Sequence, residues 1–134
     1  MLEFDSLSNK IIKCAITVHK ALGPGLFEQV YKVCLHHELQ KSGLNVLAEV
    51  GIPVMYDGVC LDLGYRIDLL VNDSIIIELK AVEQLSTVHK SQLLTHLRFA
   101  NKHVGLLLNF NSTLLRERGI VRVVNSYSPF TPPA

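Results

Sequence analysis

Hydrophobic residues in the first third of the chain recur with the spacing of two amphipathic helices. Over residues 7–22, "LSNKIIKCAITVHKAL", the apolar positions follow a helical period, so we predict a helix there. Ser6 or Ser8 is expected to cap its first turn. The Gly-Pro-Gly sequence at 23–25 is expected to end it, because glycine accepts left-handed geometry and proline cannot continue the ladder. A second helix is predicted over residues 26–42.

After Gly43 the pattern becomes that of β-strands. Three segments rich in β-branched residues are each predicted to form strand structure: "NVLAEVGIPVMY" (45–56), "GYRIDLLV" (64–71) and "SIIIELKAV" (74–82). In the first segment, Gly51 and Pro53 indicate an edge position or a bulge. The dipeptide Asp57-Gly58 predicts a tight hairpin turn.

The second half of the chain continues with one helix and two strands. The helix is predicted over "TVHKSQLLTHLRFANK" (87–102), a buried strand over "VGLLLNF" (104–110), and a short strand over "GIVRVV" (119–124). The resulting order, α-α-β-β-β-α-β-β, indicates an α/β mixture built on one sheet. We therefore expect a single domain over residues 1–125, followed by a flexible proline-rich tail at 126–134.

The composition limits the classes of protein to consider. Hydrophobic residues make up 49% of the chain and the mean hydropathy is +0.29, which suits a packed core. No apolar run approaches the roughly 20 residues that cross a bilayer, and "MLEFDSLSNK" lacks the pattern of a secretory signal. We expect a cytoplasmic protein without membrane association. Its three cysteines show no zinc-ligand spacing, which argues against a structural zinc site or a disulfide framework.

Charge is distributed unevenly along the chain. Residues 1–79 contain six Lys/Arg against ten Asp/Glu, whereas residues 80–134 contain seven Lys/Arg against two Asp/Glu. The first part is thus suited to hold cations and the second to meet phosphates. The alternative is that folding mixes both sets on one neutral surface.

Three charged residues interrupt two of the most apolar predicted strands. Asp68 lies in "YRIDLLV", and Glu78 and Lys80 lie in "IIIELKA", where alternation places the latter two on one face. A buried unpaired charge is costly, so these groups need partners or a metal ion. Carboxylates can hold Mg²⁺, and a lysine can orient or deprotonate water, as phosphodiester hydrolysis requires. The alternative is a structural ion pair or charges at a strand edge.

The hairpin between these strands tests the hypothesis of a shared site. A two-residue turn at Asn72-Asp73 would pair Asp68 with Ile77, and Asp68 and Glu78 would then face opposite sides of the sheet. We therefore predict a three-residue loop, which includes Ser74, or a bulge that adds one residue.

Polar residues on the following predicted helix share one face. His89, Gln92 and His96 lie at i, i+3 and i+7, so they look either into the site or out to water. Further along, Arg98, Lys102 and His103 are candidate phosphate contacts.

The stretch "GPGLFEQVY" (23–31) is similar to the Gly-x-x-Glu-x-x-Tyr signature of the GxxExxY protein family, which is grouped with the PD-(D/E)XK nuclease superfamily. The resemblance runs from "ITVHKALGPGLFEQVY" through "GYRIDLLV", "IIIELKAV", "HKSQLLTHLR" and "GLLLNF" to "GIVRVV", and so covers nearly the whole chain. It implies an α/β fold with a restriction-endonuclease-like α-β-β-β-α-β core, in which helices flank a central mixed sheet.

The resemblance also implies roles for single residues. Asp68 resembles the superfamily's aspartate, Glu78 and Lys80 its (D/E)-x-K pair, Glu28 an acidic residue of the first core helix, and Gln92 a glutamine of the next helix. It implies Mg²⁺ or Mn²⁺ as cofactor, held by Asp68, Glu78 and Glu28, with the Leu79 carbonyl as a further ligand. One departure is His96, because the family segment usually reads like "QLLxYLK" and here reads "QLLTHLR".

Within the signature, Glu28 and Tyr31 stand one helical turn apart and can present a carboxylate and a hydroxyl to the same pocket. We expect Glu28 to point at Asp68. Taken alone, Glu28 is an ordinary carboxylate near a helix start, where the helix dipole favours it.

Residues and resemblance together predict a metal-dependent nuclease acting on DNA, with RNA as the other substrate class. Its expected catalytic residues are Asp68, Glu78, Lys80, Gln92 and Glu28, and its expected nucleic-acid contacts are Arg98, Lys90, Lys102, Tyr31 and Arg122. Two alternatives are a nucleic-acid-binding module without turnover and a dimeric interaction domain. A homodimer is also compatible with the nuclease.

Overall fold

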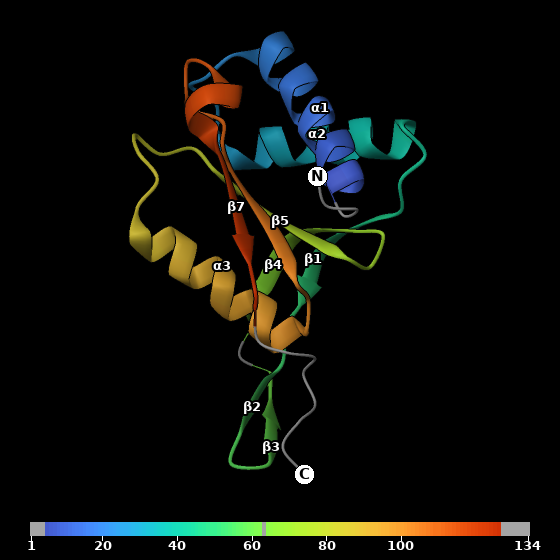
Figure 1. Cartoon of the computed structure of the whole chain (residues 1–134), viewed down its shortest axis with the longest axis vertical. Helices are drawn as coiled ribbons and strands as arrows, with labels where there is room; N and C mark the ends of the chain where they lie inside the picture. The colour runs from blue at the N-terminus through green and yellow to red at the C-terminus, as the bar shows by residue number, and fades with distance from the viewer. Residues whose placement is uncertain (1–4, 63, 127–134) are drawn as a thin grey trace.

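A five-stranded mixed sheet forms the centre of the computed structural model, which describes residues 5–62 and 64–126 (Figure 1). The strand order is β1-β4-β5-β6-β7, with β5 and β6 parallel and every other neighbouring pair antiparallel. The elements are α1 (Asp5–Leu22), α2 (Glu28–Lys41), β1 (Val46–Gly51), β2 (Val54–Tyr56), β3 (Val59–Leu61), β4 (Arg66–Val71), β5 (Ile75–Lys80), α3 (Thr87–Ala100), β6 (Val104–Asn109), the π-helical turn η1 (Leu115–Gly119) and β7 (Ile120–Val124). The expected α/β class, a central mixed sheet flanked by helices, is confirmed.

Helices pack on both faces of this sheet and enclose two separate hydrophobic cores. Side chains from α1 and α2 meet one face, where Leu35, Ile77 and Leu106 are fully buried. The other face is covered by α3, whose Leu93 packs there. A Cβ atom at Gly105 would lie 2.8 Å from a methyl carbon of Leu93, so the glycine lets α3 approach the backbone of β6 closely.

The first two helices begin at different residues from those predicted. Helix α1 already includes Asp5, so Ser6 and Ser8 lie inside it and the prediction that either caps it is wrong. Ser8 is buried, and its hydroxyl has no hydrogen-bond partner among the described residues. Helix α2 begins at Glu28, because Phe27 is still extended, with φ −71° and ψ 150°.

A short hairpin, β2–β3, stands apart from the central sheet and projects from the body of the molecule (Figure 1). Its predicted tight turn is confirmed: Tyr56 pairs with Val59, and both Asp57 and Gly58 have positive φ. The prediction that all strands share one sheet is wrong. The ladder of edge strand β1 ends where the Ile52 N–H bonds to the Tyr65 carbonyl, since Pro53 has no N–H to donate.

Two further predictions concern the C-terminal part and membrane association. The π-helical turn before β7 was not predicted, and the expected tail at 126–134 lies outside the described residues except for Ser126. Within the described ranges, no helix has both the length and the apolar character needed to cross a membrane.

Tyr31 fastens the Gly-Pro-Gly loop to the body of the protein. Its side chain is fully buried and its ring stacks on Phe110, with centroids 4.6 Å apart. The hydroxyl donates to the Gly23 carbonyl at 2.5 Å and accepts from the Leu26 N–H at 3.1 Å. Both ends of the loop are thereby tied to one side chain of α2. Because the ring is buried and the hydroxyl is occupied, the predicted nucleic-acid contact by Tyr31 is wrong.

We expect Tyr31→Phe to lower the free energy of unfolding by about 1–3 kcal/mol, since two loop groups lose their partner while the ring still packs. Chemical denaturation monitored by circular dichroism measures this. The matched control is Tyr56→Phe, whose ring is 72% exposed. Equal stability of wild type and Tyr31→Phe would show that the hydroxyl does not hold the loop.

Candidate active site

The loop between β4 and β5 has three residues, as the hypothesis of a shared site required. Val71 pairs with Ile75, Leu70 with Ile76 and Leu69 with Ile77, so Asn72, Asp73 and Ser74 form the loop. The next residues in this register are Asp68 and Glu78, which therefore stand opposite each other. Asn72 and Asp73 both have a φ of 51°, a conformation that Asn and Asp tolerate better than most residues.

The sheet is irregular at Asp68 on both sides of β4. Towards β5 the ladder stops at Leu69, and the Asp68 carboxylate accepts the Leu79 N–H at 2.8 Å. Towards β1, the register sets Asp68 opposite Glu49, which has a φ of 55° and is left out of the ladder between Ala48 and Val50. The strands thus part where the carboxylate is placed. Since the N–H and C=O of a strand residue point to the same side, the Leu79 carbonyl is directed into the same gap.

Glu78 is buried in the middle of the sheet and is held by helix α3. The side chain of Glu78 is 7% exposed, and its Oε2 lies 2.5 Å from Nδ1 of His96. The His96 ring is in turn tilted against Tyr65, with centroids 6.2 Å apart. One oxygen of Glu78 is therefore engaged by His96, while the other is available to a further ligand.

The surroundings of Asp68 raise the pKa of its carboxyl above the ordinary value. Burial is the largest cause, and the negative charges of Glu78 and Glu49 act in the same direction. The Leu79 N–H and the Lys32 ammonium oppose the shift. Ionising Asp68 beside Glu78 therefore costs more free energy in the folded, metal-free protein than in water, and a cation between the two carboxylates would reduce this cost.

Lys80 and Glu28 lie near the end of β5. Lys80 is half-buried and shares the Glu78 face of the strand; within the described residues its ammonium forms no ion pair or hydrogen bond. Glu28, at the start of α2, accepts the Ala81 N–H at 3.3 Å. This hydrogen bond places the Glu28 carboxylate beside the end of β5. The prediction that Glu28 points at Asp68 is therefore wrong.

The donor set fits a divalent ion held by two carboxylates. No group of three or more His, Cys, Asp or Glu side chains close enough to hold a metal ion forms within the described ranges. A three-carboxylate set that includes Glu28 is therefore not formed. Mg²⁺ commonly uses one or two carboxylates and fills its other positions with carbonyls, water and phosphate. Asp68, Glu78 and the Leu79 carbonyl satisfy that requirement.

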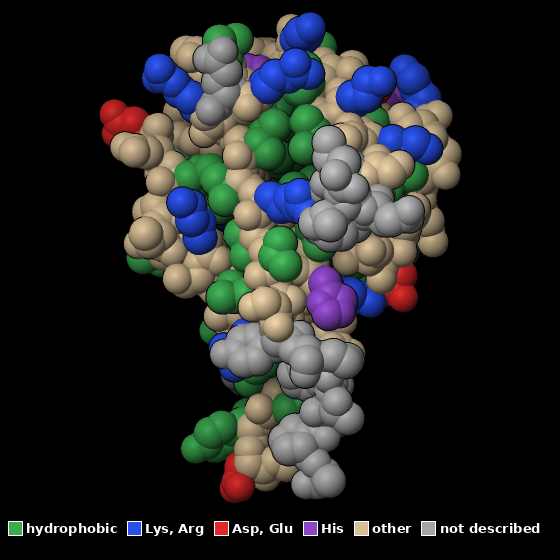
Figure 2. All heavy atoms as spheres, viewed as in Figure 1, with side chains coloured by type: hydrophobic (Ala, Val, Ile, Leu, Met, Phe, Trp, Pro, Cys, Tyr) green, Lys and Arg blue, Asp and Glu red, His purple; other side chains and the backbone are tan. Residues whose placement is uncertain are grey.

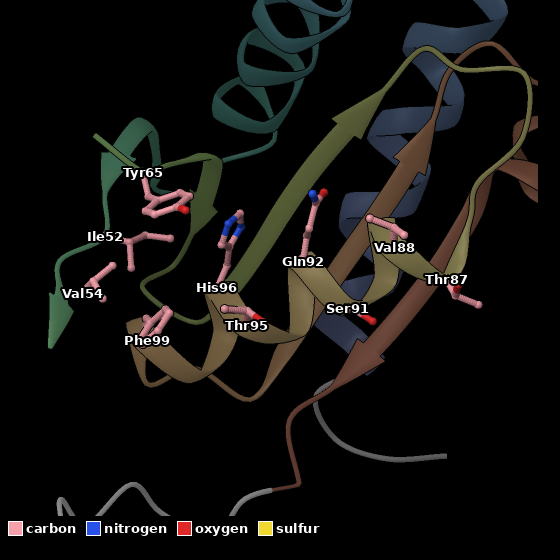
Figure 3. A pocket seen from close by; sticks show the side chains of 10 residues that line it. All are labelled: Ile52, Val54, Tyr65, Thr87, Val88, Ser91, Gln92, Thr95, His96 and Phe99. Carbon is pink, nitrogen blue, oxygen red and sulfur yellow. The ribbon is translucent and has the colours of Figure 1, made fainter. Parts of the chain in front are cut away.

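The histidines of the predicted polar face on α3 have different partners. His89 closes a capping box with Ser86 at the start of α3, so its role is structural. His96 reaches Glu78, and Gln92 lines a pocket next to it (Figure 3). The composition of the helix did not distinguish these roles, since both histidines lie on the same face.

The predicted nucleic-acid contacts do not gather at one place. Lys102 pairs with Asp73 at 2.9 Å, beside the β4–β5 loop. Asp73 precedes β5 and Lys80 ends it, so the length of the strand, about 16 Å, separates this pair from Lys80. Arg98 lies in the last turn of α3 and Lys90 in its first turns, while Arg122 is exposed on β7.

Asn109 was not predicted and supports the loop that follows β5. It is 2% exposed and neighbours Lys80 across the β5–β6 pair. Its side chain accepts the Val82 N–H at 3.1 Å and donates to the Val82 carbonyl at 2.9 Å. The available signal was a lone polar residue at the end of the apolar run "VGLLLNF".

A comparison with protein-family models matches residues 5–123 to the PD-(D/E)XK nuclease superfamily. The match covers most of the chain, and the protein therefore belongs to this superfamily. Its sheet and flanking helices agree with the restriction-endonuclease-like fold. Nucleases of the superfamily generally use divalent metal ions and act on nucleic acids. Searches of curated proteins and of solved structures found no match.

The raised pKa of Asp68 predicts how stability depends on pH. As the pH rises from the ordinary pKa of Asp towards the raised pKa of Asp68, this carboxyl loses its proton in the unfolded chain before it does so in the folded protein. The free energy of unfolding of the metal-free protein therefore falls over this range, and it stays lower at neutral pH. We expect Asp68→Asn, in the presence of a chelator, to raise the Tm at neutral pH by a few degrees. This gain in Tm should disappear at a pH below the ordinary pKa of Asp, where Asp68 is protonated in both the folded and the unfolded chain.

Thermal melts across the acidic to neutral range measure this effect. Glu83→Gln, which neutralises an exposed carboxylate in the loop after β5, is the matched control and should leave the Tm unchanged. A lower Tm for Asp68→Asn at neutral pH would show that the charged carboxylate stabilises the fold.

Proposed function

We propose that the protein is a metal-dependent nuclease that hydrolyses phosphodiester bonds in DNA, with RNA as the second substrate class. The observation that carries the proposal is the three-residue β4–β5 loop, which sets Asp68 opposite Glu78 where the strands part. Mg²⁺ or Mn²⁺ would be held by these two carboxylates and the Leu79 carbonyl. When bound, the ion would supply positive charge against the phosphate and make water more acidic.

The remaining site residues would act around this pair. Lys80, which has no partner in the described part of the chain, would orient or deprotonate the attacking water, or balance the charge that develops on the phosphate. Glu28 would act through water, since its carboxylate is bound to the backbone beyond Lys80. Gln92 would orient the site from α3.

The surface charge supports a polyanionic partner. Lys and Arg side chains gather on the face in Figure 2 where α1 and β7 lie in front, while Asp and Glu stand at its margins. Exposed basic residues on α1, η1 and β7 are Lys10, Lys13, Lys20, Arg116, Arg118 and Arg122. Such residues hold nucleic-acid phosphates without reading sequence.

The GxxExxY group is the proposed place of this chain within the superfamily. Gly25, Glu28 and Tyr31 carry its spacing. In this chain the signature has a structural explanation, because Tyr31 closes the loop and Glu28 caps the end of β5.

Cleavage assays test the proposed reaction. We expect wild type to cut plasmid or single-stranded DNA with Mg²⁺ or Mn²⁺, and Asp68→Ala and Lys80→Ala to lose about 10²–10⁴-fold in rate. Lys41→Ala, an exposed residue at the end of α2, should cut like wild type. Equal activity in all variants would indicate a contaminant. Salt-dependent DNA binding without cleavage would identify a binding module instead.

His96 provides a second test, with metal affinity as the readout. By holding one oxygen of Glu78, it should orient the other towards the ion, and loss of such a partner typically costs about 10–100-fold in affinity. We expect His96→Ala to show this loss in Mn²⁺ titrations, and His96→Gln to retain most of the affinity. His37→Ala, on the exposed side of α2, is the control. Unchanged Mn²⁺ affinity of His96→Ala would show that His96 does not contribute to metal binding.

A further inference from the structure

A pocket of about 700 Å³ opens between α3 and the segments that lead into and out of the β2–β3 hairpin (Figure 3). One side is formed by Ile52, Val54 and Tyr65, and the other by residues of α3 that include Val88, Gln92, Thr95, His96 and Phe99. The volume is in the range of pockets that bind small molecules, and an apolar lining with a few polar groups is typical of them.

The pocket adjoins the candidate metal site through one side chain. His96 lines the pocket and also bonds to Glu78 at 2.5 Å. In Figure 3 the His96 and Tyr65 side chains lie on facing sides of the pocket, and their ring centroids are 6.2 Å apart. A molecule in contact with His96 would therefore lie next to the proposed metal site, where Glu78 would help to hold the ion that binds the substrate phosphodiester.

The lining matches a flat molecule with apolar faces and polar edges. Tyr65 is 51% exposed and Phe99 42% exposed, so both present open aromatic surface. The amide of Gln92 has no hydrogen-bond partner in the described part of the chain and can both donate and accept. Nucleobases have this combination of π-faces and hydrogen-bonding edges, and proteins that bind single strands stack them on aromatic side chains.

Charge favours a nucleic acid over a protein side chain as the occupant. The helix that forms one wall, α3, has no Asp or Glu from Thr87 to Ala100, whereas it carries Lys90 and Arg98. Both cations lie outside the pocket lining, so a phosphate-bearing strand would meet no negative charge on the α3 wall. Bases in a duplex are already stacked on each other, so a base must leave its stack to enter.

We propose that this pocket receives an unstacked nucleobase next to the phosphodiester bond at the candidate site, so that the protein prefers single-stranded nucleic acid to duplex. The inference rests on the proposed nuclease function for the position of the phosphate. It adds a binding site for the base and a substrate class.

Binding assays in a chelator test the pocket without cleavage. Fluorescence anisotropy with an oligothymidine octamer and with a duplex of the same length should show tighter binding of the single strand. Tyr65→Ala should weaken single-strand binding by about 5- to 100-fold, the range expected for loss of one stacked base. Tyr65→Phe keeps the ring and should bind like wild type. Tyr56→Ala, an exposed aromatic outside the pocket, is the matched control.

Two further measurements separate stacking from charge and from misfolding. Tyr65→Ala removes an aromatic ring and no charge, so it should weaken binding while leaving its salt dependence unchanged. Thr95→Phe places a ring at an exposed position of the pocket wall, and it should block single-strand binding while thermal melts report a folded protein. A 2-aminopurine base in the octamer should lose fluorescence on binding to wild type and not to Thr95→Phe.

The proposal is overturned if single strand and duplex bind equally, or if Tyr65→Ala and Thr95→Phe bind the octamer like wild type. It is also overturned if Thr95→Phe abolishes self-association in ultracentrifugation while the octamer does not bind, since a second copy of the chain would then be the occupant. Octamer binding without any cleavage would keep the pocket and reject the nuclease. Equal cleavage of duplex and single strand that Thr95→Phe does not change would support the nuclease and reject the pocket as a base-binding site.

Discussion

The candidate active site depends on the register of one β-hairpin. A three-residue loop after β4 sets Asp68 opposite Glu78, and a loop shorter by one residue would turn the two carboxylates to opposite faces of the sheet. The same register lets the Asp68 carboxylate take the Leu79 N–H in place of a backbone carbonyl. The strands can then separate without leaving that N–H unpaired, and the Leu79 carbonyl faces the gap.

The two carboxylates at this gap destabilise the folded protein when no cation is bound. Burial and the charge of Glu78 raise the pKa of Asp68, so the site is unfavourable without a cation. Its surroundings are firmly held: His96 engages Glu78, Glu28 caps the end of β5, and Asn109 secures the loop that follows. A rigid frame around a destabilising pair of charges is the arrangement expected of a site prepared for a ligand.

Sequence periodicity predicted the long helices and strands reliably, but it was weak where a single residue determines the local backbone conformation. It predicted α3 because its apolar positions recur with a helical period, and the strands β4 to β6 because each is a short run of mostly apolar residues. It missed the π-helical turn and the separate β2–β3 sheet, which depend on local backbone geometry around Gly119 and Pro53. Tyr31 was expected to present its hydroxyl to the same pocket as Glu28, because their spacing places them on one helical face. Spacing does not show what covers that face, and Tyr31 is fully buried.

The sequence alone determined the long helices and the central strands, because these follow from local spacing. It also determined the interruption of two apolar strands by Asp68, Glu78 and Lys80, and the two alternatives for the hairpin. Only the tertiary structure decided which alternative holds. It also decided that His96 meets Glu78, since the packing of α3 on the sheet joins residues 18 positions apart. The nearby pocket between α3 and the hairpin likewise arises from elements distant in sequence, whose contacts no local pattern encodes.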